Sequence, residues 1–200
     1  MKTYDKAYFD RWYRSKKRVI SPSLIRRKVQ MAIGIAEQLL ERPVRSVLDV
    51  GCGEGGWLRP LRELRPSLRY LGLDSSEYAV KRFGTKRNIR LARFGDTAAA
   101  IGASKFDLVV CSDVLHYIDE GELEKGLAAI AAATRGIAFL ELLTREDDPS
   151  GDLRGFKLRP AAWYAEHFAR AGLIACGMQC YAGPESVVHA CALDVLPGRS

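Results

Sequence analysis

Apolar residues along the chain gather in short runs rich in β-branched residues, separated by longer segments of mixed polarity. Five of these runs have the length and composition of buried strands. They cover residues 46–50, 69–73, 89–94, 106–111 and 136–143. The segments after the first, second and fourth runs carry apolar residues at helical spacing. Strands that alternate with helices predict an α/β fold, in which right-handed crossovers build a parallel sheet covered on both faces.

Two further helices and a closing pair of strands complete the predicted elements. Ser21 can cap a helix that continues to Pro43. Another helix is expected over residues 160–171. The last two apolar runs, 173–181 and 186–195, are joined by four residues, which are too few for a parallel crossover. We therefore expect these two strands to be antiparallel neighbours.

The composition is that of one ordinary soluble domain. The chain has 200 residues, of which 48% are apolar and 28% are charged. No apolar run reaches the roughly 20 residues that span a bilayer, and the start lacks the pattern of a secretory signal. We expect a cytoplasmic protein without a membrane partner. Residues 1–42 are expected to form a basic amino-terminal lid and helix within the same domain as residues 43–200.

The cysteines and histidines show no pattern of metal ligands. None of the five cysteines forms a C-x-x-C pair, and the three histidines are scattered. A structural zinc site needs four such ligands at characteristic spacings. We therefore expect reduced thiols and no bound metal.

The net charge of +7 is concentrated at the amino terminus. Residues 1–28 carry ten basic and two acidic side chains, so the rest of the chain sums to about −1. A segment of this kind suits nucleic acid, a phosphorylated substrate or an acidic partner, and it is equally typical of a solvated basic face.

The stretch SVLDVGCGEGGW, residues 46–57, joins the first predicted strand to the next helix. Its glycines fit two spacings, G-x-G-x-x-G ending at Gly56 and G-x-G-x-G ending at Gly55. Either turn brings backbone amides close to a ligand. Asp49, at the end of the strand, would repel a pyrophosphate and attract a cationic group. The stretch therefore favours a cationic cofactor over a dinucleotide.

In DVGCGEG, residues 49–55, the chain matches a D/E-x-G-x-G-x-G motif in full and resembles the class I S-adenosylmethionine-dependent methyltransferases. The resemblance covers nearly the whole chain. It implies a Rossmann-like three-layer sandwich, with residues 43–200 as the methyltransferase domain. Its seven-stranded, mostly parallel sheet would have the order 3-2-1-4-5-7-6 and an antiparallel last strand. It also implies S-adenosyl-L-methionine as cofactor and S-adenosyl-L-homocysteine as product.

The resemblance assigns cofactor contacts residue by residue. Asp74 corresponds to the acid that accepts the ribose hydroxyls, and Asp96 to the acid near the adenine, although Asp96 can equally cap the helix that follows. Cys111 would offer its backbone carbonyl to the cofactor. Trp12, on an amino-terminal lid, and Trp57 are candidates for its methionine end, with packing in the core as the alternative. The expected set is Asp49, Gly51, Cys52, Gly53, Gly55, Trp57, Asp74, Ser75, Asp96, Cys111, Ser112 and Trp12.

The loop after the fourth strand, residues 111–119, corresponds to the active-site loop of the family. His116 is the first candidate for a general base, because its unperturbed pKa lies near neutrality, and Asp113 is the second. The alternative for His116 is a turn residue bonded to nearby backbone. We expect the acceptor to enter between the amino-terminal segment, this loop and residues 144–160. That pocket would mix the charges of Arg11, Arg14, Arg145 and Arg154 with those of Glu141, Glu146, Asp147 and Asp148.

The leading function is methyl transfer to an oxygen or nitrogen atom of a small-molecule acceptor. The active-site loop reads SDVLHY, whereas DNA-amino or protein-glutamine methylation would call for N/D-P-P-Y/F. The alternatives are an RNA methyltransferase that grips phosphates with Lys16, Lys17 and Arg18, and a non-catalytic cofactor-binding protein. A dehydrogenase is disfavoured by the closing hairpin. The patterns identify neither the acceptor nor the oligomeric state.

Overall fold

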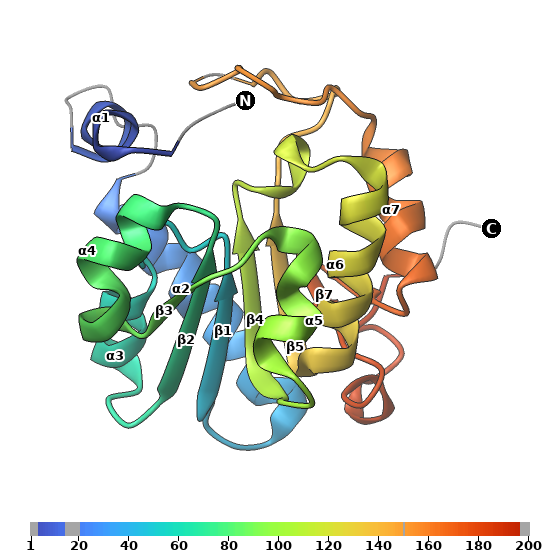
Figure 1. The fold of residues 1–200 in the computed structure, drawn as a ribbon. Coiled ribbons are helices and arrows are strands. Elements are labelled where there is room, and N and C mark those ends of the chain that lie inside the picture. The colour runs from blue at the N-terminus through green and yellow to red at the C-terminus, as the bar shows by residue number, and fades with distance from the viewer. Residues whose placement is uncertain (1–3, 15–20, 150, 197–200) are drawn as a thin grey trace.

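The computed structural model describes residues 4–14, 21–149 and 151–196, which fold around one seven-stranded sheet between layers of helices (Figure 1). The sheet order is β3-β2-β1-β4-β5-β7-β6. Strand β7 runs antiparallel to β5 and β6, and the other neighbouring pairs are parallel. The predicted fold class and strand order are therefore confirmed. The strands are β1 Ser46–Val50, β2 Arg69–Asp74, β3 Ile89–Leu91, β4 Phe106–Ser112, β5 Thr134–Glu141, β6 Ile174–Gly177 and β7 Cys180–Ala182.

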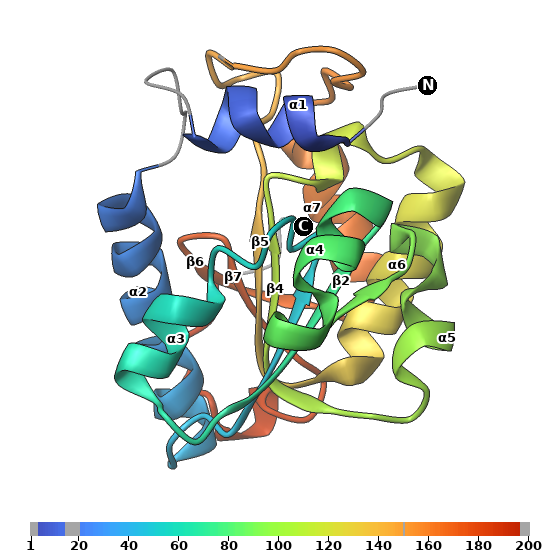
Figure 2. The same ribbon diagram turned by 60° about the vertical axis from the view of Figure 1, so that its left-hand side comes forward.

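Helices cover both faces of the sheet and also cross one of its edges. Helices α2 and α3 pack on one face, and α6 and α7 pack on the other. The short helix α1 and the π-helical turn Asp10–Arg14 cross the carboxyl edge of the parallel strands (Figure 2). The helices are α1 Lys6–Phe9, α2 Pro22–Leu40, α3 Leu58–Leu64, α4 Glu77–Arg87, α5 Thr97–Ile101, α6 Glu120–Ala133 and α7 Ala161–Arg170. No helix in the described ranges is both long and apolar enough to span a membrane.

Helix α2 begins where the sequence predicts. The Ser21 hydroxyl accepts a hydrogen bond from the Leu24 amide at 3.2 Å, which satisfies one of the free amides of the first turn. Ala32 and Ala36 are fully buried, and such small side chains let α2 lie close to the sheet. Helix α2 thereby becomes part of the core, and it projects its first turns toward the carboxyl edge.

The closing hairpin is shorter than predicted and is displaced toward the amino terminus. Gly177, at a φ of +87°, divides the apolar run 173–181, so its two halves pair with each other as β6 and β7. The predicted strand 186–195 is wrong, because this segment contains the 3-10 turn Val187–His189 and leaves Leu193 98% exposed. The third strand is also shorter than its predicted range. Beyond β3 the chain turns so that Phe94 becomes buried.

Candidate active site

The glycine-rich turn after β1 has the conformation expected of a ligand-binding turn. Gly51, Gly53 and Gly55 have φ values of +72°, +54° and +75°, a region that side chains other than glycine rarely adopt. A Cβ atom on Gly51 would also lie 2.3 Å from a methyl carbon of Val114. Gly56 lacks a positive φ and is exposed. The backbone therefore follows the G-x-G-x-G spacing.

Asp49 lies beneath this turn, 2% exposed. The Tyr70 hydroxyl donates to its Oδ2 atom at 2.7 Å, and the described residues place no cation against it. Burial raises the pKa of Asp49 to about 7, with a further rise from Asp74 and a partial offset from the Tyr70 hydrogen bond. The sheet therefore holds an acid near the turn whose charge is balanced by no cation of the described residues.

Asp74 ends β2 beside the same turn. Its two carboxylate oxygens accept hydrogen bonds from the Gly53 amide at 2.6 Å and the Ser76 amide at 2.8 Å. Burial raises its pKa, although both amide hydrogen bonds act in the opposite direction. Each carboxylate oxygen keeps a second lone pair, so Asp74 retains the capacity to accept the hydroxyls of a ribose.

The segment Asp5–Arg14 lies directly over the turn. A Cβ atom on Gly53 would be 3.1 Å from the Tyr13 hydroxyl and 3.3 Å from a ring carbon of Phe9. Phe9 is 2% exposed and stacks on Tyr78 of α4. Arg14 pairs with Glu54 within the turn. A cofactor that rests on these glycines therefore requires this segment to move outward.

The remaining predicted cofactor residues lie at different depths. Cys52 and Cys111 are buried, and burial raises the pKa of both thiols well above the ordinary value. Ser75 and Asp96 are exposed, and the Asp96 side chain does not cap α5. Trp57 is 6% exposed and packs on Phe139, with a ring separation of 5.2 Å, as its core alternative expects.

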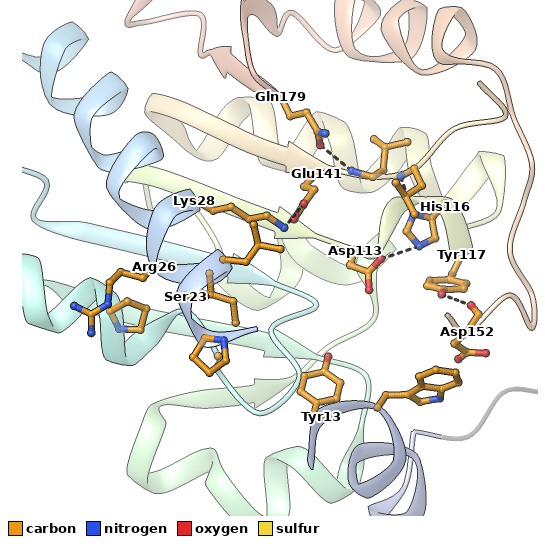
Figure 3. Close-up of a pocket in the computed structure, with 18 of the residues that line it drawn as sticks. Tyr13, Ser23, Arg26, Lys28, Asp113, His116, Tyr117, Glu141, Asp152 and Gln179 are labelled. Atoms are coloured by element: carbon orange, nitrogen blue, oxygen red, sulfur yellow. Dashed lines mark hydrogen bonds and ion pairs between the residues drawn. The ribbon is translucent and has the colours of Figure 1, made fainter. Parts of the chain in front are cut away.

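A cavity of about 760 Å³ adjoins the turn at the carboxyl edge (Figure 3). Three of its walls are those expected for the acceptor pocket: the amino-terminal segment, the loop after β4 and residues 152–156. The first two turns of α2 and the start of α3 add a wall that the sequence did not predict. The residues that line the cavity include Trp12, Tyr13, Lys28, Asp113, His116, Tyr117, Glu141, Asp152, Phe156 and Gln179.

The charges that face the cavity differ from the expected set. Of the eight charged residues predicted there, Glu141 lines it, and the cations on its wall are Arg26, Lys28 and Arg59. Arg26 and Arg59 both pair with Glu63. Arg145 and Glu146 fall outside the lining because their segment turns away along α7, where Glu146 accepts from the Ala161 amide. Lys16, Lys17 and Arg18 lie outside the described residues.

His116 is 1% exposed and faces Asp113 at the cavity. The Leu143 amide donates to its Nδ1 atom at 3.3 Å, so the neutral ring carries its proton on Nε2. Nε2 lies 3.3 Å from Asp113 Oδ1 without the alignment of a hydrogen bond. Asp113 itself has a φ of +63°, a costly conformation for this residue. The backbone therefore occupies Nδ1 of His116, whereas the Asp113 carboxylate stands beside Nε2 at the cavity.

A second polar group lies where β4 and β5 end. Lys28 of α2 pairs with Glu141 (Figure 3). The Ser112 hydroxyl donates to the same carboxylate. Next to them, Gln179 accepts a hydrogen bond from the Leu142 amide at 3.0 Å. The sequence analysis missed Lys28 and Gln179 as pocket residues, because they come from segments far from every recognised motif.

Comparison with known proteins agrees with this architecture. Residues 48–136 match the family model described as a methyltransferase domain. Over 98 residues the chain is 34% identical to malonyl-[acyl-carrier protein] O-methyltransferase from Legionella pneumophila subsp. pneumophila (strain Philadelphia 1). That match covers 45% of the chain and 34% of the enzyme, so the chain spans about a third of the length of this relative.

Solved structures extend the match to most of the chain. An S-adenosylmethionine-dependent methyltransferase from Archaeoglobus fulgidus aligns with a TM-score of 0.61 at 17% identity, over 84% of this chain and 73% of that one. Magnesium protoporphyrin IX methyltransferase from Synechocystis PCC 6803, solved with bound S-adenosylhomocysteine, aligns with a TM-score of 0.59 at 19% identity. The alignment covers 86% of this chain and 87% of that enzyme. Residues 48–136 thus match the model of a methyltransferase domain, and the chain shares its fold with solved S-adenosylmethionine-dependent methyltransferases.

Proposed function

We propose that the chain transfers a methyl group from S-adenosyl-L-methionine to an oxygen or nitrogen atom of a small-molecule acceptor. The observation that carries the proposal is the cavity of about 760 Å³ beside the glycine-rich turn. A cavity of this volume suits a small ligand. The relative named as an O-methyltransferase favours oxygen as the acceptor atom.

The residues at the turn fit the cofactor. Asp74 would hold the ribose hydroxyls, the amides of the turn would face the methionine end, and buried Asp49 would favour its positive charge. Once bound, the cofactor supplies an activated methyl group. The segment Asp5–Arg14 would then close over it as a lid, with Trp12 and Tyr13 on the cavity wall beside the two reactants.

The chain contributes mainly alignment of the two reactants, which can lower a barrier by roughly 7 to 11 kcal/mol. Asp113 is placed to accept the proton that the acceptor loses as it forms its bond to the methyl carbon. His116, with Nδ1 engaged by Leu143 and Nε2 lying 3.3 Å from Asp113 Oδ1, would position that carboxylate. This reverses the expected order of the two residues as base.

A structure with bound S-adenosylhomocysteine tests the cofactor assignment. The sulfur is expected beside the cavity, with Phe9 and Tyr13 displaced from Gly53. Calorimetry on the same protein provides the affinity. Wild-type protein that binds no S-adenosylhomocysteine would contradict the proposal and favour a non-catalytic role.

Once an acceptor is found, the two loop residues can be separated by their kinetics. Asp113→Asn should lower kcat by about a hundredfold or more, as expected for loss of a general base. His116→Asn should lower kcat less and shift its pH profile, because Asp113 remains. A His116 variant with the larger defect would restore His116 as the base.

A further inference from the structure

The wall of the cavity at the end of β5 carries polar groups that methyl transfer itself does not use. Lys28 and Glu141 form an ion pair there, and their side chains are only 16% and 20% exposed. Withdrawing two charges from water costs several kcal/mol per ion before their attraction is counted, and an apolar pair often fills such a position as well. A buried pair on a cavity wall therefore points to a polar ligand.

This wall presents hydrogen-bond donors to the cavity. Glu141 uses Oε1 for Lys28 and Oε2 for the Ser112 hydroxyl. The Lys28 ammonium has three N–H donors, and among the residues that the structure describes it contacts one acceptor, Glu141. Two of its donors are therefore available to a ligand.

Gln179 adds donors at the same place. Its side-chain oxygen accepts from the Leu142 amide, so its NH₂ group points away from β5, and the residue lines the cavity. Gln179 and Met178 form the two-residue turn between β6 and β7, with φ values of +61° and +50°. Turns of this type prefer Asn-Gly. A glutamine held in this conformation beside a cavity indicates that its side chain is needed there.

We propose that Lys28 and Gln179 form a subsite for an oxoanion, a carboxylate or a phosphate, carried by the acceptor. The inference rests on the proposed function and defines its substrate class as anionic small molecules. Arg26 and Arg59 share Glu63, whereas Lys28, paired with Glu141, is the cation on the same wall of the cavity as Gln179. Glu141 holds the ammonium in place, and Gln179 supplies the second donor.

Binding of small probes tests the subsite without knowledge of the acceptor. Benzoate, phenyl phosphate, benzamide and benzylamine would be titrated calorimetrically into the full chain, with and without S-adenosylhomocysteine. Benzoate and phenyl phosphate represent the two sources of an oxoanion. Wild-type protein should bind at least one of them ten times more tightly than benzamide or benzylamine.

Two variants remove the donors while keeping the shape of the wall. Lys28→Met/Glu141→Gln removes both charges together, and Gln179→Glu keeps the acceptor for Leu142 but replaces the NH₂ group. Both variants should bind the oxoanion probe at least ten times more weakly than wild type and leave the affinity for S-adenosylhomocysteine unchanged. The matched control is Arg65→Met/Glu37→Gln, which removes another ion pair of α2 and should leave both affinities unchanged.

Three results would overturn the subsite. Benzylamine could bind more tightly than either anion, which would make Glu141 and Asp113 the recognition groups. The variants could retain the anion affinity. The Lys28 variant could also lose its affinity for S-adenosylhomocysteine, which would assign Lys28 to the carboxylate of the cofactor. Failure of the proposed function is distinguishable, because wild-type protein would then bind no S-adenosylhomocysteine whatever the probes do.

Discussion

Two buried aspartates at opposite ends of the sheet, Asp107 and Asp49, have opposite electrostatic surroundings. Asp107 begins β4 and is 1% exposed. Arg42 donates to its two oxygens at 2.7 and 3.0 Å, and the Arg45 amide donates at 2.7 Å. Burial acts to raise the pKa of Asp107, but these partners hold it below the ordinary value. Asp49 is 2% exposed, its one side-chain donor among the described residues is the Tyr70 hydroxyl, and its pKa rises to about 7.

The difference shows that one sheet contains a buried acid with a structural role, Asp107, and a buried acid whose surroundings are typical of a functional site, Asp49. At the amino end, Arg42 neutralises the Asp107 carboxylate. This ion pair fixes β4 against the end of α2. At the carboxyl end, no cation from the described part of the chain lies against the buried acid Asp49. Such strongly perturbed acids concentrate at functional sites. The cationic methyl donor completes this charge in the proposed function.

The largest expected effect is at the amino end. Arg42→Ala leaves Asp107 buried with weaker partners and should lower the free energy of unfolding by about 3 kcal/mol, measured by urea denaturation at pH 7. Wild-type protein should lose the same stabilisation as the pH falls below the ordinary carboxyl pKa, because the pKa of Asp107 is lower in the folded than in the unfolded protein. Cofactor affinity should stay unchanged. Arg59→Ala, which breaks an exposed pair, is the control and should cost well under 1 kcal/mol.

At the carboxyl end the same kind of experiment should change stability in the opposite direction. The folded pKa of Asp49 lies above its unfolded value, so its ionisation costs stability increasingly from about pH 4 to pH 7. Asp49→Asn should therefore raise the free energy of unfolding at pH 8 by roughly 2 kcal/mol, with the amide retaining part of the burial cost. At pH 4, where folded Asp49 is protonated, the variant should be less stable than wild type by a similar amount, because a pKa shift from 3.8 to about 7 corresponds to a total change of roughly 4 kcal/mol between the two pH values. An equal change at both pH values would remove the electrostatic explanation.

Asp74 provides a smaller effect, confined to binding. Asp74→Ala removes the proposed ribose acceptor and should weaken S-adenosylhomocysteine at least tenfold, or about 1.4 kcal/mol, by calorimetry. Circular dichroism would confirm that the fold survives. Unchanged affinity would mean that the cofactor does not use the end of β2.

The cover of the carboxyl end should give the smallest effect. Arg14 tethers the segment Asp5–Arg14 to Glu54 through a partly exposed pair, and such pairs contribute up to about 1 kcal/mol. Arg14→Ala should speed cofactor association about twofold in stopped-flow fluorescence. Slower association would show that the closed segment assists entry.

The sequence predicts most of the sheet and the turn, because both depend on local patterns. Alternating strands and helices define the parallel part, and Gly51, Gly53 and Gly55 define the turn. The predicted bounds of the closing hairpin were wrong, because Gly177 divides the apolar run 173–181, which its pattern predicts to be one strand, into β6 and β7. The Lys28–Glu141 pair joins residues 113 positions apart, and no local pattern encodes such a contact. The closure of Phe9 over Gly53 depends likewise on tertiary packing.

In the proposed function, a cationic cofactor balances the charge of Asp49. This balance is tested most directly by titrating S-adenosylmethionine at pH 7 in buffers of different ionisation enthalpy, which reports the protons exchanged on binding. A bound cation should lower the pKa of Asp49, so wild-type protein should release more protons than Asp49→Asn does. Equal proton exchange in the two proteins, or no binding by wild type, would contradict the account.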